Sequence, residues 1–303
     1  MPNSFDSTTR EPSLDAIVRP IEPADIPAAK AFLEAHIDTS VYLLSNMSDL
    51  GIRSTSHPMS GNFLLIEEDG ELVGVFCLTL RGDLLAQTGR RTEFASLILS
   101  ASRPDTQAIL GVLAEWRLAE ALWSALTMEP GFTPVYEREC IVYGITRVPA
   151  PRTVSEGIVI RAMSMADYGA WEPVDRAFCA EEGLAVMPDE VRRRNGYQSR
   201  ADVGGWWGAF AEGLLVSTAC LNAGYQGIGQ VGGVYTRPAY RRLGIGQQVM
   251  HELMRYHEAR NGLQEVVLFT ADRNHTARAF YESMGFSQRD RFGLLFRLPG
   301  ERP

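Results

Sequence analysis

The sequence predicts an α/β protein made of two tandem domains, each a mixed sheet flanked by helices. One observation is the length of 303 residues, which exceeds the ~100–200 residues of an ordinary single domain. Another is an internal repeat, in which residues 17–28 match 159–170 and residues 72–78 match 215–221. The last is the order of predicted elements in the second half, where an early hairpin precedes strand–helix–strand crossovers; this order is typical of a mixed sheet.

The repeat is carried by identical residues at equivalent positions. In both copies a short apolar strand leads into a turn whose Asp starts a helix. The identical residues are Arg19, Ala24, Asp25 and Ala28, which recur as Arg161, Ala166, Asp167 and Ala170. A Gly-Phe pair also precedes an apolar strand near each end, at 131–132 and 285–286. We therefore expect a duplicated domain.

The boundary between the copies is predicted by the segment 147–157, which contains two prolines and a glycine and has no apolar periodicity. The first residues of the chain are polar and lack the apolar run of a signal peptide. The predicted division is a flexible tail over 1–13, a first domain over 14–147, a linker over 148–157 and a second domain over 158–299.

Turn residues and apolar periodicity divide the second domain into elements. A tight turn at Glu212-Gly213 joins two strands, and Pro238 ends a third because proline cannot continue a central strand. The predicted elements are strand 158–161, helices 166–180 and 188–198, strands 205–211, 213–222 and 229–236, helix 244–260, strand 265–270, helix 275–284 and strand 292–298. In the first domain we expect a helix near 105–127.

Composition excludes several classes of function. The net charge of −8 argues against a general nucleic-acid-binding protein, which needs a basic surface. The four cysteines lie far apart without Cys-x-x-Cys spacing, so we expect no disulfide scaffold and no metal site, and a reducing cytoplasm as the location. No stretch reaches the ~18 apolar residues of a membrane span, so we expect no membrane partner.

The segment 230–254 carries the signal for chemistry. A β-rich run over 231–236 is followed by a short loop, by Gly244 and Gly246, and by a helix with a buried stripe of Ile245, Val249 and Leu253. The glycines therefore lie at a helix entry, where backbone N–H groups lack partners and the helix dipole is positive. Because glycine allows close approach to the backbone, this entry is suited to a pyrophosphate.

The charge pattern of this segment also favours the binding of an anion. No carboxylate occurs between Glu212 and Glu252, whereas three arginines do. A dinucleotide fold would need a third glycine where Val249 stands, and Glu265 opens a strand instead of closing one. A P-loop would need Gly-Lys-Ser/Thr, which is absent. The alternative is a helix entry that uses glycine for packing, with its arginines in solvent.

At this point the sequence resembles the GNAT superfamily of N-acetyltransferases. The signature of that family is Arg/Gln-x-x-Gly-x-Gly/Ala between a strand and a helix, matched here by Arg241, Gly244 and Gly246. A second family motif, further along the chain, is matched by Asn274, Tyr281 and Gly285-Phe286. The resemblance covers 158–299 directly, and the first half only through the internal repeat, so it implies two tandem GNAT-like domains.

The resemblance implies transfer of an acetyl group from acetyl-CoA, as co-substrate and without a metal, to a primary amine by direct attack. It implies Tyr281 as the general acid for the departing thiolate; the alternative for Tyr281 is a core aromatic residue. Asn274 would either bond the CoA arm or cap its helix. The implied cofactor-binding residues are Val234, Tyr235, Thr236, Arg241, Arg242, Leu243, Gly244, Ile245, Gly246, Gln247 and Asn274.

The chain departs from the family pattern at the general base. Some members carry a Glu on the strand before the cofactor strand, but residues 213–223 contain no acid and no His. A water, Glu181, Glu182 or a group from the first half would have to serve. The acceptor is expected to be a small-molecule or peptide amine that the sequence does not name.

The first copy is expected to be degenerate. It has no Arg-x-x-Gly-x-Gly, its glycine cluster runs in the reverse order at Gly89-Arg90-Arg91, and Thr127 stands where counting back from Gly131 would place the tyrosine. The chain is then expected to act as a monomer or homodimer. Two alternatives stay open: a non-catalytic acyl-CoA-binding or sensing protein, and an aminoacyl transferase of the tandem-GNAT type, against which the net acidity weighs.

Overall fold

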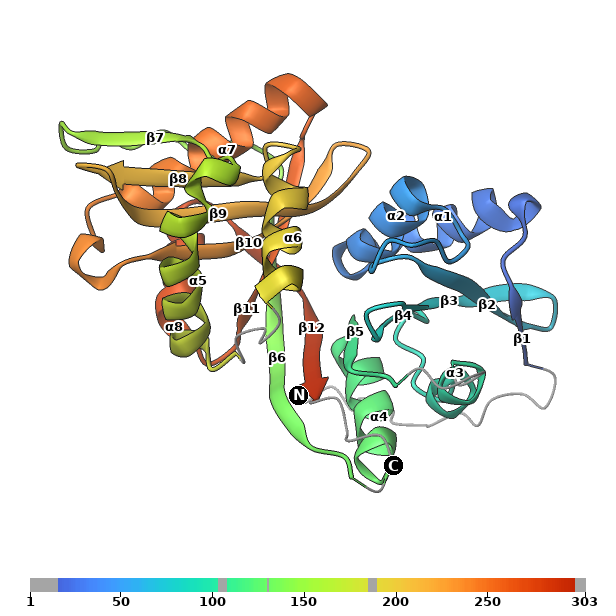
Figure 1. Ribbon diagram of the computed structural model, residues 1–303. Coiled ribbons are helices and arrows are strands. Elements are labelled where there is room, and N and C mark those ends of the chain that lie inside the picture. Colours follow the sequence, from blue (N-terminus) through green and yellow to red (C-terminus); the bar gives the residue numbers. More distant parts are fainter. Residues whose placement is uncertain (1–15, 103–107, 130, 185–189, 298–303) are drawn as a thin grey trace, which may run out of the picture. The chain divides into compact units, whose positions relative to one another are not determined.

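The computed structural model describes residues 16–102, 108–129, 131–184 and 190–297. The chain divides into two compact units, each with its own mixed sheet and helices (Figure 1). Unit 1 runs through Glu137 and includes residues from Gly293 on, and unit 2 is Arg138–Phe292. The predicted tail, 1–13, lies outside the described residues. No described helix is both long enough and apolar enough to cross a membrane.

Unit 1 is a sheet in the order β1-β2-β3-β4-β5, followed by the end of β12. Its pairs are antiparallel from β1 to β4, and β4 pairs with β5 in parallel. The elements of the first half are β1 (Ile17–Pro20), α1 (Ile26–Glu34), α2 (Ile37–Leu50), β2 (Gly61–Glu68), β3 (Glu71–Thr79), β4 (Asp83–Gln87), α3 (Ala95–Ala101), β5 (Gly111–Glu115), α4 (Trp116–Thr127) and β6 (Pro134–Ile145).

Unit 2 repeats this arrangement. The order β7-β8-β9-β10-β11 has antiparallel pairs from β7 to β10 and a parallel β10–β11 pair, after which β6 and the start of β12 follow. The elements of the second half are β7 (Ile158–Ala162), α5 (Tyr168–Glu182), α6 (Glu190–Ala201), β8 (Trp206–Ala211), β9 (Leu214–Tyr225), β10 (Ile228–Thr236), α7 (Ile245–Asn261), β11 (Glu265–Ala271), α8 (His275–Ser283) and β12 (Ser287–Arg297). The predicted tandem mixed sheets are therefore present.

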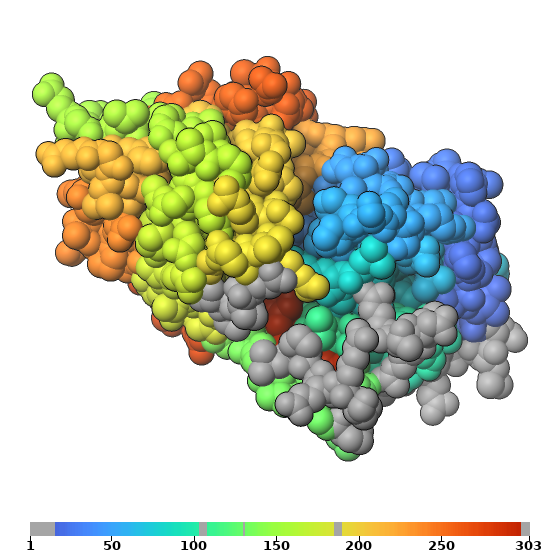
Figure 2. All heavy atoms as spheres, in the orientation of Figure 1, coloured from blue at the N-terminus to red at the C-terminus, as the bar shows by residue number. Residues whose placement is uncertain are grey.

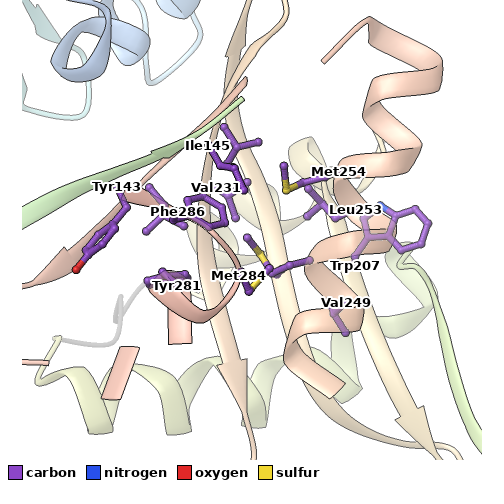
Figure 3. Close-up of a cluster of buried hydrophobic side chains, with 14 of the residues drawn as sticks. Tyr143, Ile145, Trp207, Val231, Val249, Leu253, Met254, Tyr281, Met284 and Phe286 are labelled. Atoms are coloured by element: carbon purple, nitrogen blue, oxygen red, sulfur yellow. The ribbon is translucent and has the colours of Figure 1, made fainter. Parts of the chain in front are cut away.

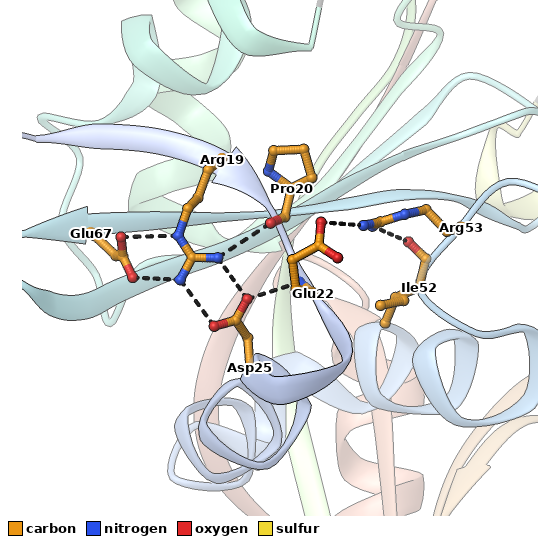
Figure 4. Close-up of polar contacts among 7 residues, drawn as sticks. All are labelled: Arg19, Pro20, Glu22, Asp25, Ile52, Arg53 and Glu67. Atoms are coloured by element: carbon orange, nitrogen blue, oxygen red, sulfur yellow. Dashed lines mark hydrogen bonds and ion pairs between the residues drawn. The ribbon is translucent and has the colours of Figure 1, made fainter.

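The identical residues of the repeat make the same contacts in both units. In unit 1 the Arg19 guanidinium binds Asp25 at 2.6 Å and Glu67 at 2.7 Å (Figure 4). In unit 2 Arg161 binds Asp167 at 2.7 Å. In both, the aspartate also accepts a hydrogen bond from a backbone N–H three residues earlier, which fixes the turn before the helix.

The last strand of each copy belongs to the unit formed by the other copy. Residues 138–145 of β6 lie in unit 2, where β6 pairs with β11 from Cys140 to Ile145. The end of β12 lies in unit 1, where the Arg297 N–H donates to the Leu110 carbonyl at 2.9 Å. The units therefore differ from the predicted limits, 14–147 and 158–299. Duplicated sequences offer two similar strands for one position, and such elements can exchange.

Two clusters of buried side chains cover opposite faces of the unit 2 sheet. Trp206 and Trp207 are neighbours on β8, so they point to opposite faces. Trp207 packs in the cluster that contains α7, and Trp206 packs in the cluster that contains α5 and α6. Helices α5 and α6 cover the face turned to the viewer in Figures 1 and 2. Both tryptophans are buried.

Several element boundaries differ from the prediction. Residues 105–107 of the helix expected near 105–127 lie outside the described residues, and its later part is the strand β5 followed by the helix α4, because a buried parallel strand has an apolar run that resembles a buried helix. The strand expected at 292–298 begins at Ser287, where its first residues are largely exposed and polar. The strand expected at 213–222 continues to Tyr225. Of the helix expected at 188–198, residues 188 and 189 lie outside the described residues, and α6 ends at Ala201.

Candidate functional site

The parallel strands β10 and β11 separate part of the way along their length. Their pairing runs from Ile228 opposite Glu265 to Val231 opposite Leu268 and then ends. Beyond that point β10 continues beside β9 to Thr236, and β11 continues beside β6. The part of β10 after Val231 therefore has an edge that does not pair with β11. Val234, Tyr235 and Thr236 lie in this part.

A bulge in β10 sets the direction of the backbone at this edge. Gly233 has φ of +58°, and a Cβ there would lie 2.8 Å from the Trp206 ring, so only glycine fits. The Gly233 and Tyr235 carbonyls accept hydrogen bonds from β9 side chains, at 3.0 and 2.9 Å. The register of the β9–β10 pair shifts between Gly232 and Tyr235, so Val234 lies within the bulge.

The loop and helix entry that follow bring backbone amides to the same place. Arg242 and Gly244 have φ of +64° and +75°, a left-handed geometry that favours glycine and that can gather N–H groups into an anion-binding nest. Ile245 and Gly246 are buried in the first turn of α7. A Cβ on Gly246 would lie 3.0 Å from Thr236 Oγ1, so the helix entry packs tightly against the end of β10.

The two arginines of the loop have different surroundings. Arg241 Nε donates to the Thr236 carbonyl at 2.8 Å, and its Nη2 contacts Glu181 Oε2 at 2.6 Å. Arg241 therefore ties the loop to the end of β10 and to α5. Arg242 is exposed, as is Leu243, whose exposed fraction is 52%. Gln247 Nε2 donates to Ser283 Oγ at 3.0 Å and joins α7 to α8.

The predicted linker lies along α7, which the sequence did not indicate. The Arg152 N–H donates to Gln248 Oε1 at 2.5 Å, and His251 Nδ1 lies 2.7 Å from the Pro149 carbonyl. Arg152 Cβ would be 3.5 Å from a Cβ on Gly244. The exposed Arg152 thus adds a cation beside the glycine-rich entry. A segment without periodicity carries no local signal for such a position.

Asn274 caps α8 and contacts the end of α5. Its Oδ1 accepts from the Ala277 N–H at 3.0 Å, and its Nδ2 donates to Glu182 Oε1 at 2.8 Å. Of the two roles open for Asn274, capping is the one that its contacts show. Ala277 and Tyr281 are four residues apart, so the capped turn and the phenol ring lie on one face of α8.

Tyr281 is buried in the main core of unit 2. Its exposed fraction is 6%, and its ring centroid lies 6.1 Å from that of Tyr143 and 5.8 Å from that of Phe286 (Figure 3). Burial raises the pKa of the Tyr281 hydroxyl, and the charge of Glu182 raises it further. The phenol therefore keeps its proton at neutral pH. Tyr143 comes from β6, which the sequence assigned to the first domain.

Two carboxylates end α5, and they differ in their partners. Glu181 is exposed and forms the ion pair with Arg241. Glu182 is half-buried and accepts the hydrogen bond from Asn274. Burial raises the pKa of Glu182, and the Asn274 hydrogen bond opposes that rise. The sequence left both Glu181 and Glu182 open as candidates for the general base that deprotonates the amine.

These features coincide with a match to a known family. The model of the acetyltransferase (GNAT) family matches residues 171–286. That range contains the end of α5, the separated part of β10, the entry of α7 and all of α8. Residues 171–286 therefore form a domain of the GNAT family of acetyltransferases. The chain is an acyltransferase.

Individual relatives agree with this assignment. The chain is 29% identical, over 238 residues, to a mycothiol acetyltransferase from Thermomonospora curvata, covering 74% of this chain and 78% of that protein. A GCN5-related N-acetyltransferase structure from Sphaerobacter thermophilus matches with a TM-score of 0.58 and 20% identity, over 97% of this chain and 99% of that one. A GNAT acetyltransferase from Colwellia psychrerythraea matches with a TM-score of 0.51 and 18% identity, over 93% of this chain and 100% of that one. Both structures share the fold across both units.

The corresponding place in unit 1 of this GNAT protein is built differently. Gln87, the last residue of β4, accepts a hydrogen bond from the Gly89 N–H at 2.9 Å and donates to Thr39 Oγ1 at 2.7 Å. The loop amide of Gly89 is therefore already hydrogen-bonded to the Gln87 side chain. In α4, Glu115 takes the capping position that Asn274 has in α8.

The residue that replaces Tyr281 depends on which end of the helix is aligned. Counting back four residues from Gly131, as Tyr281 lies four before Gly285, gave Thr127, whose hydroxyl donates to the Ser124 carbonyl at 2.8 Å. Counting from the capping residue gives Leu122, which is fully buried. The two positions are five residues apart because α4 has 12 residues and α8 has 9, and because Gly131 lies four residues after the end of α4 whereas Gly285 lies two after the end of α8. Neither position carries a phenol.

Proposed function

We propose that this GNAT protein transfers the acetyl group of acetyl-CoA to a primary amine by direct attack, at a site in unit 2. The observation that carries the proposal is the separation of β10 from β11 beside the glycine-rich entry of α7. An unpaired strand edge can bind an extended amide chain, and a helix entry can bind a pyrophosphate. CoA contains both groups in sequence.

The residues of the site fit this ligand. The backbone of Val234, Tyr235 and Thr236 would pair with the pantetheine arm as an added strand. The N–H groups of residues 242–247 would hold the pyrophosphate, because first-turn amides have no intrahelical partners. Arg241, whose donors already bind Thr236 and Glu181, would hold the loop in shape.

Chemistry at the site would use one backbone amide and one phenol. The Val234 N–H would stabilise negative charge on the thioester oxygen as the amine adds to the carbonyl carbon. When the C–S bond breaks, the thiolate would take the proton of Tyr281, and the phenolate would then take the remaining extra proton from the acetylated nitrogen. The raised pKa of Tyr281 supports this role, since the acid must be protonated before each turnover.

The likeness to a mycothiol acetyltransferase makes a small-molecule amine the first acceptor class to test, and a peptide amine the second. The test measures release of free thiol from acetyl-CoA with a panel of diamines, amino sugars, amino-acid amides and lysine peptides. Mass spectrometry of the product should show one added acetyl group on nitrogen. Tight binding of acetyl-CoA with no transfer to any amine would instead support an acyl-CoA-sensing protein.

We also propose that the first copy (14–147) is degenerate and binds no acyl-CoA. The support comes from the Gln87 side chain, which already pairs with the Gly89 amide that a phosphate would need. The absence of a phenol at Thr127 or Leu122 supports the same conclusion for catalysis.

A further inference from the structure

The half-buried carboxylate of Glu182 lies at the end of α5 and contacts the start of α8. Glu182 is the last residue of α5, a helix that packs on the face opposite to α7 and Tyr281. Its partner Asn274 lies three residues after Ala271, the end of β11, and caps α8. A carboxylate that contacts this cap is therefore beside the end of the separated strands, on the side from which α5 approaches.

The charges around this carboxylate come from three directions. Glu181 adjoins it on α5, Arg138 and Cys140 face it from β6, and Arg273 and Tyr281 face it from the turn and helix after β11. The two arginines favour its charged form, whereas burial and Glu181 disfavour it. The electrostatic coupling extends to Tyr281, whose hydroxyl senses the charge of Glu182.

One oxygen of Glu182 remains available. Oε1 accepts the Asn274 hydrogen bond at 2.8 Å, and within the described residues Oε2 accepts none. Oε2 is not one of the buried polar atoms that lack a partner, so it is open to solvent, and a cation that enters from solvent can reach it. Glu181 differs in its partner, because its Oε2 pairs with the Arg241 guanidinium at 2.6 Å and its charge is already balanced by a cation of this chain.

We infer that Glu182 binds the ammonium of the acceptor and removes its proton before attack on the thioester. This assignment rests on the proposed function. It also fits the strand before the cofactor strand, where 213–223 offer no acid or His. The acceptor would then be a cationic primary amine, because the site provides a negative charge and a proton acceptor in one group.

The protons balance with two groups of this chain. One N–H bond of the ammonium breaks, its electron pair stays on nitrogen, and the Glu182 carboxylate takes the proton and later passes it to solvent. The neutral amine then forms the N–C bond, and the carbonyl electron pair moves to oxygen. As the C–S bond breaks, Tyr281 protonates the sulfur and recovers a proton from the nitrogen. One proton is released per acetyl group transferred.

The test uses the full-length Glu182→Gln variant. Glutamine retains an oxygen for the Asn274 hydrogen bond but cannot accept the proton. With the best amine of the panel, kcat/KM at neutral pH should fall by about 100-fold or more, the range of a general base. In the variant, kcat/KM should rise tenfold per pH unit, because the rate then follows the fraction of amine that is already neutral. Acetyl-CoA affinity should stay at the wild-type value.

Two further variants separate catalysis from structure. Asn274→Ala leaves the carboxylate but removes a hydrogen bond that lowers the pKa of Glu182, so the acidic limb of its kcat/KM profile should move to higher pH, without the tenfold rise per pH unit over the whole range that Glu182→Gln shows. Glu181→Gln removes a charge that raises the same pKa, so that limb should move to lower pH, whatever its effect on acetyl-CoA affinity through Arg241.

The outcomes are distinct. A Glu182→Gln protein with the wild-type rate and profile would overturn the assignment while leaving the proposed function intact. The same holds if Asn274→Ala reproduces the altered profile, since the effect would then come from the α5–α8 contact. A wild-type protein that binds acetyl-CoA and acetylates no amine would overturn the proposed function, and this assignment with it.

Discussion

Arg161 and Asp167 form a two-pronged ion pair, with Nη1–Oδ2 and Nη2–Oδ1 distances of 2.8 and 2.7 Å. The same carboxylate accepts the Ser164 N–H at 2.9 Å and so caps the turn before α5. The counterpart in unit 1 is Arg19 with Asp25. A contact that recurs in both copies, at a site away from the chemistry, is expected to serve the fold.

The first prediction concerns Asp167→Asn. The Arg161 hydrogen bond is the main cause that lowers the pKa of Asp167 below its ordinary 3.8. A carboxylate with a lowered folded-state pKa stabilises the protein above its unfolded pKa and loses that effect as pH falls through the folded pKa. At pH 7 the variant should therefore lose about 1 kcal/mol of unfolding free energy, the usual value of a cap.

Urea unfolding of unit 2 at several pH values measures this difference. The advantage of the wild type over Asp167→Asn should be constant near neutral pH and should shrink below pH 3.8, where the unfolded carboxyl gains its proton. Asp25→Asn is the matched variant in unit 1. Equal stability of wild type and Asp167→Asn at neutral pH would contradict the prediction.

The sequence predicted the features that depend on local residue types. The repeat was visible because Arg161 and Asp167 need each other's charge at a fixed spacing. The glycine-rich entry of α7 was visible because Gly244 has positive φ and Gly246 packs against Thr236. Hydrophobic periodicity located most helices and strands of unit 2. Each of these signals is contained in a short segment of the sequence, so it can be recognised without knowing the tertiary structure.

Features that depend on distant partners were not predictable in the same way. The exchange of β6 and β12 between the units could not be predicted from the residues of either strand, because both strands present suitable apolar residues to a sheet neighbour. The position of Arg152 against Gly244 depends on a linker without periodicity. The choice between Glu181 and Glu182 required knowing that Arg241 engages one and Asn274 the other.

The second prediction compares the two ends of α7. Gly244 and Gly262 cap the helix with φ of +75° and +65°, and added Cβ atoms would meet nothing closer than 3.5 Å at the first and nothing within 4 Å at the second. Alanine at either should therefore cost a similar backbone strain of about 1 kcal/mol. Only Gly244→Ala should weaken acetyl-CoA binding, by roughly tenfold or 1.4 kcal/mol, because it shifts the amides of the helix entry.

Isothermal titration of both variants with acetyl-CoA, together with thermal unfolding, separates binding from stability. The Gly262→Ala variant controls for the loss of stability itself. If both variants lose affinity equally, the helix entry has no special role in binding the pyrophosphate.

The third prediction concerns stoichiometry. Because Gln87 occupies the loop amide in unit 1, the wild type should bind one acetyl-CoA per chain. Gly246→Val should bind none, since the added methyl groups would extend from a Cβ that already lies 3.0 Å from Thr236 Oγ1 and 3.4 Å from the Phe280 ring. Two ligands per chain, or one retained in Gly246→Val, would show that unit 1 binds the thioester.

The last prediction uses two neighbouring tyrosines, Tyr281 and Tyr143, whose ring centroids are 6.1 Å apart. Tyr281→Phe should lower kcat by about 100-fold, the effect of losing a general acid, with KM for acetyl-CoA unchanged. Tyr143→Phe removes a hydrogen bond of 2.6 Å to Glu282, so it should cost about 1 kcal/mol of stability and leave kcat close to that of the wild type.

The pH dependence distinguishes the acid from a packing role for Tyr281. Because burial raises its pKa above the ordinary 10, Tyr281 should stay protonated over the assay range, and wild-type kcat should show no decline from its deprotonation below pH 10. A phenol that only fills space would give kcat values for Tyr281→Phe and Tyr143→Phe that fall together with stability. A selective loss in Tyr281→Phe, with thermal unfolding unchanged, requires the hydroxyl proton itself.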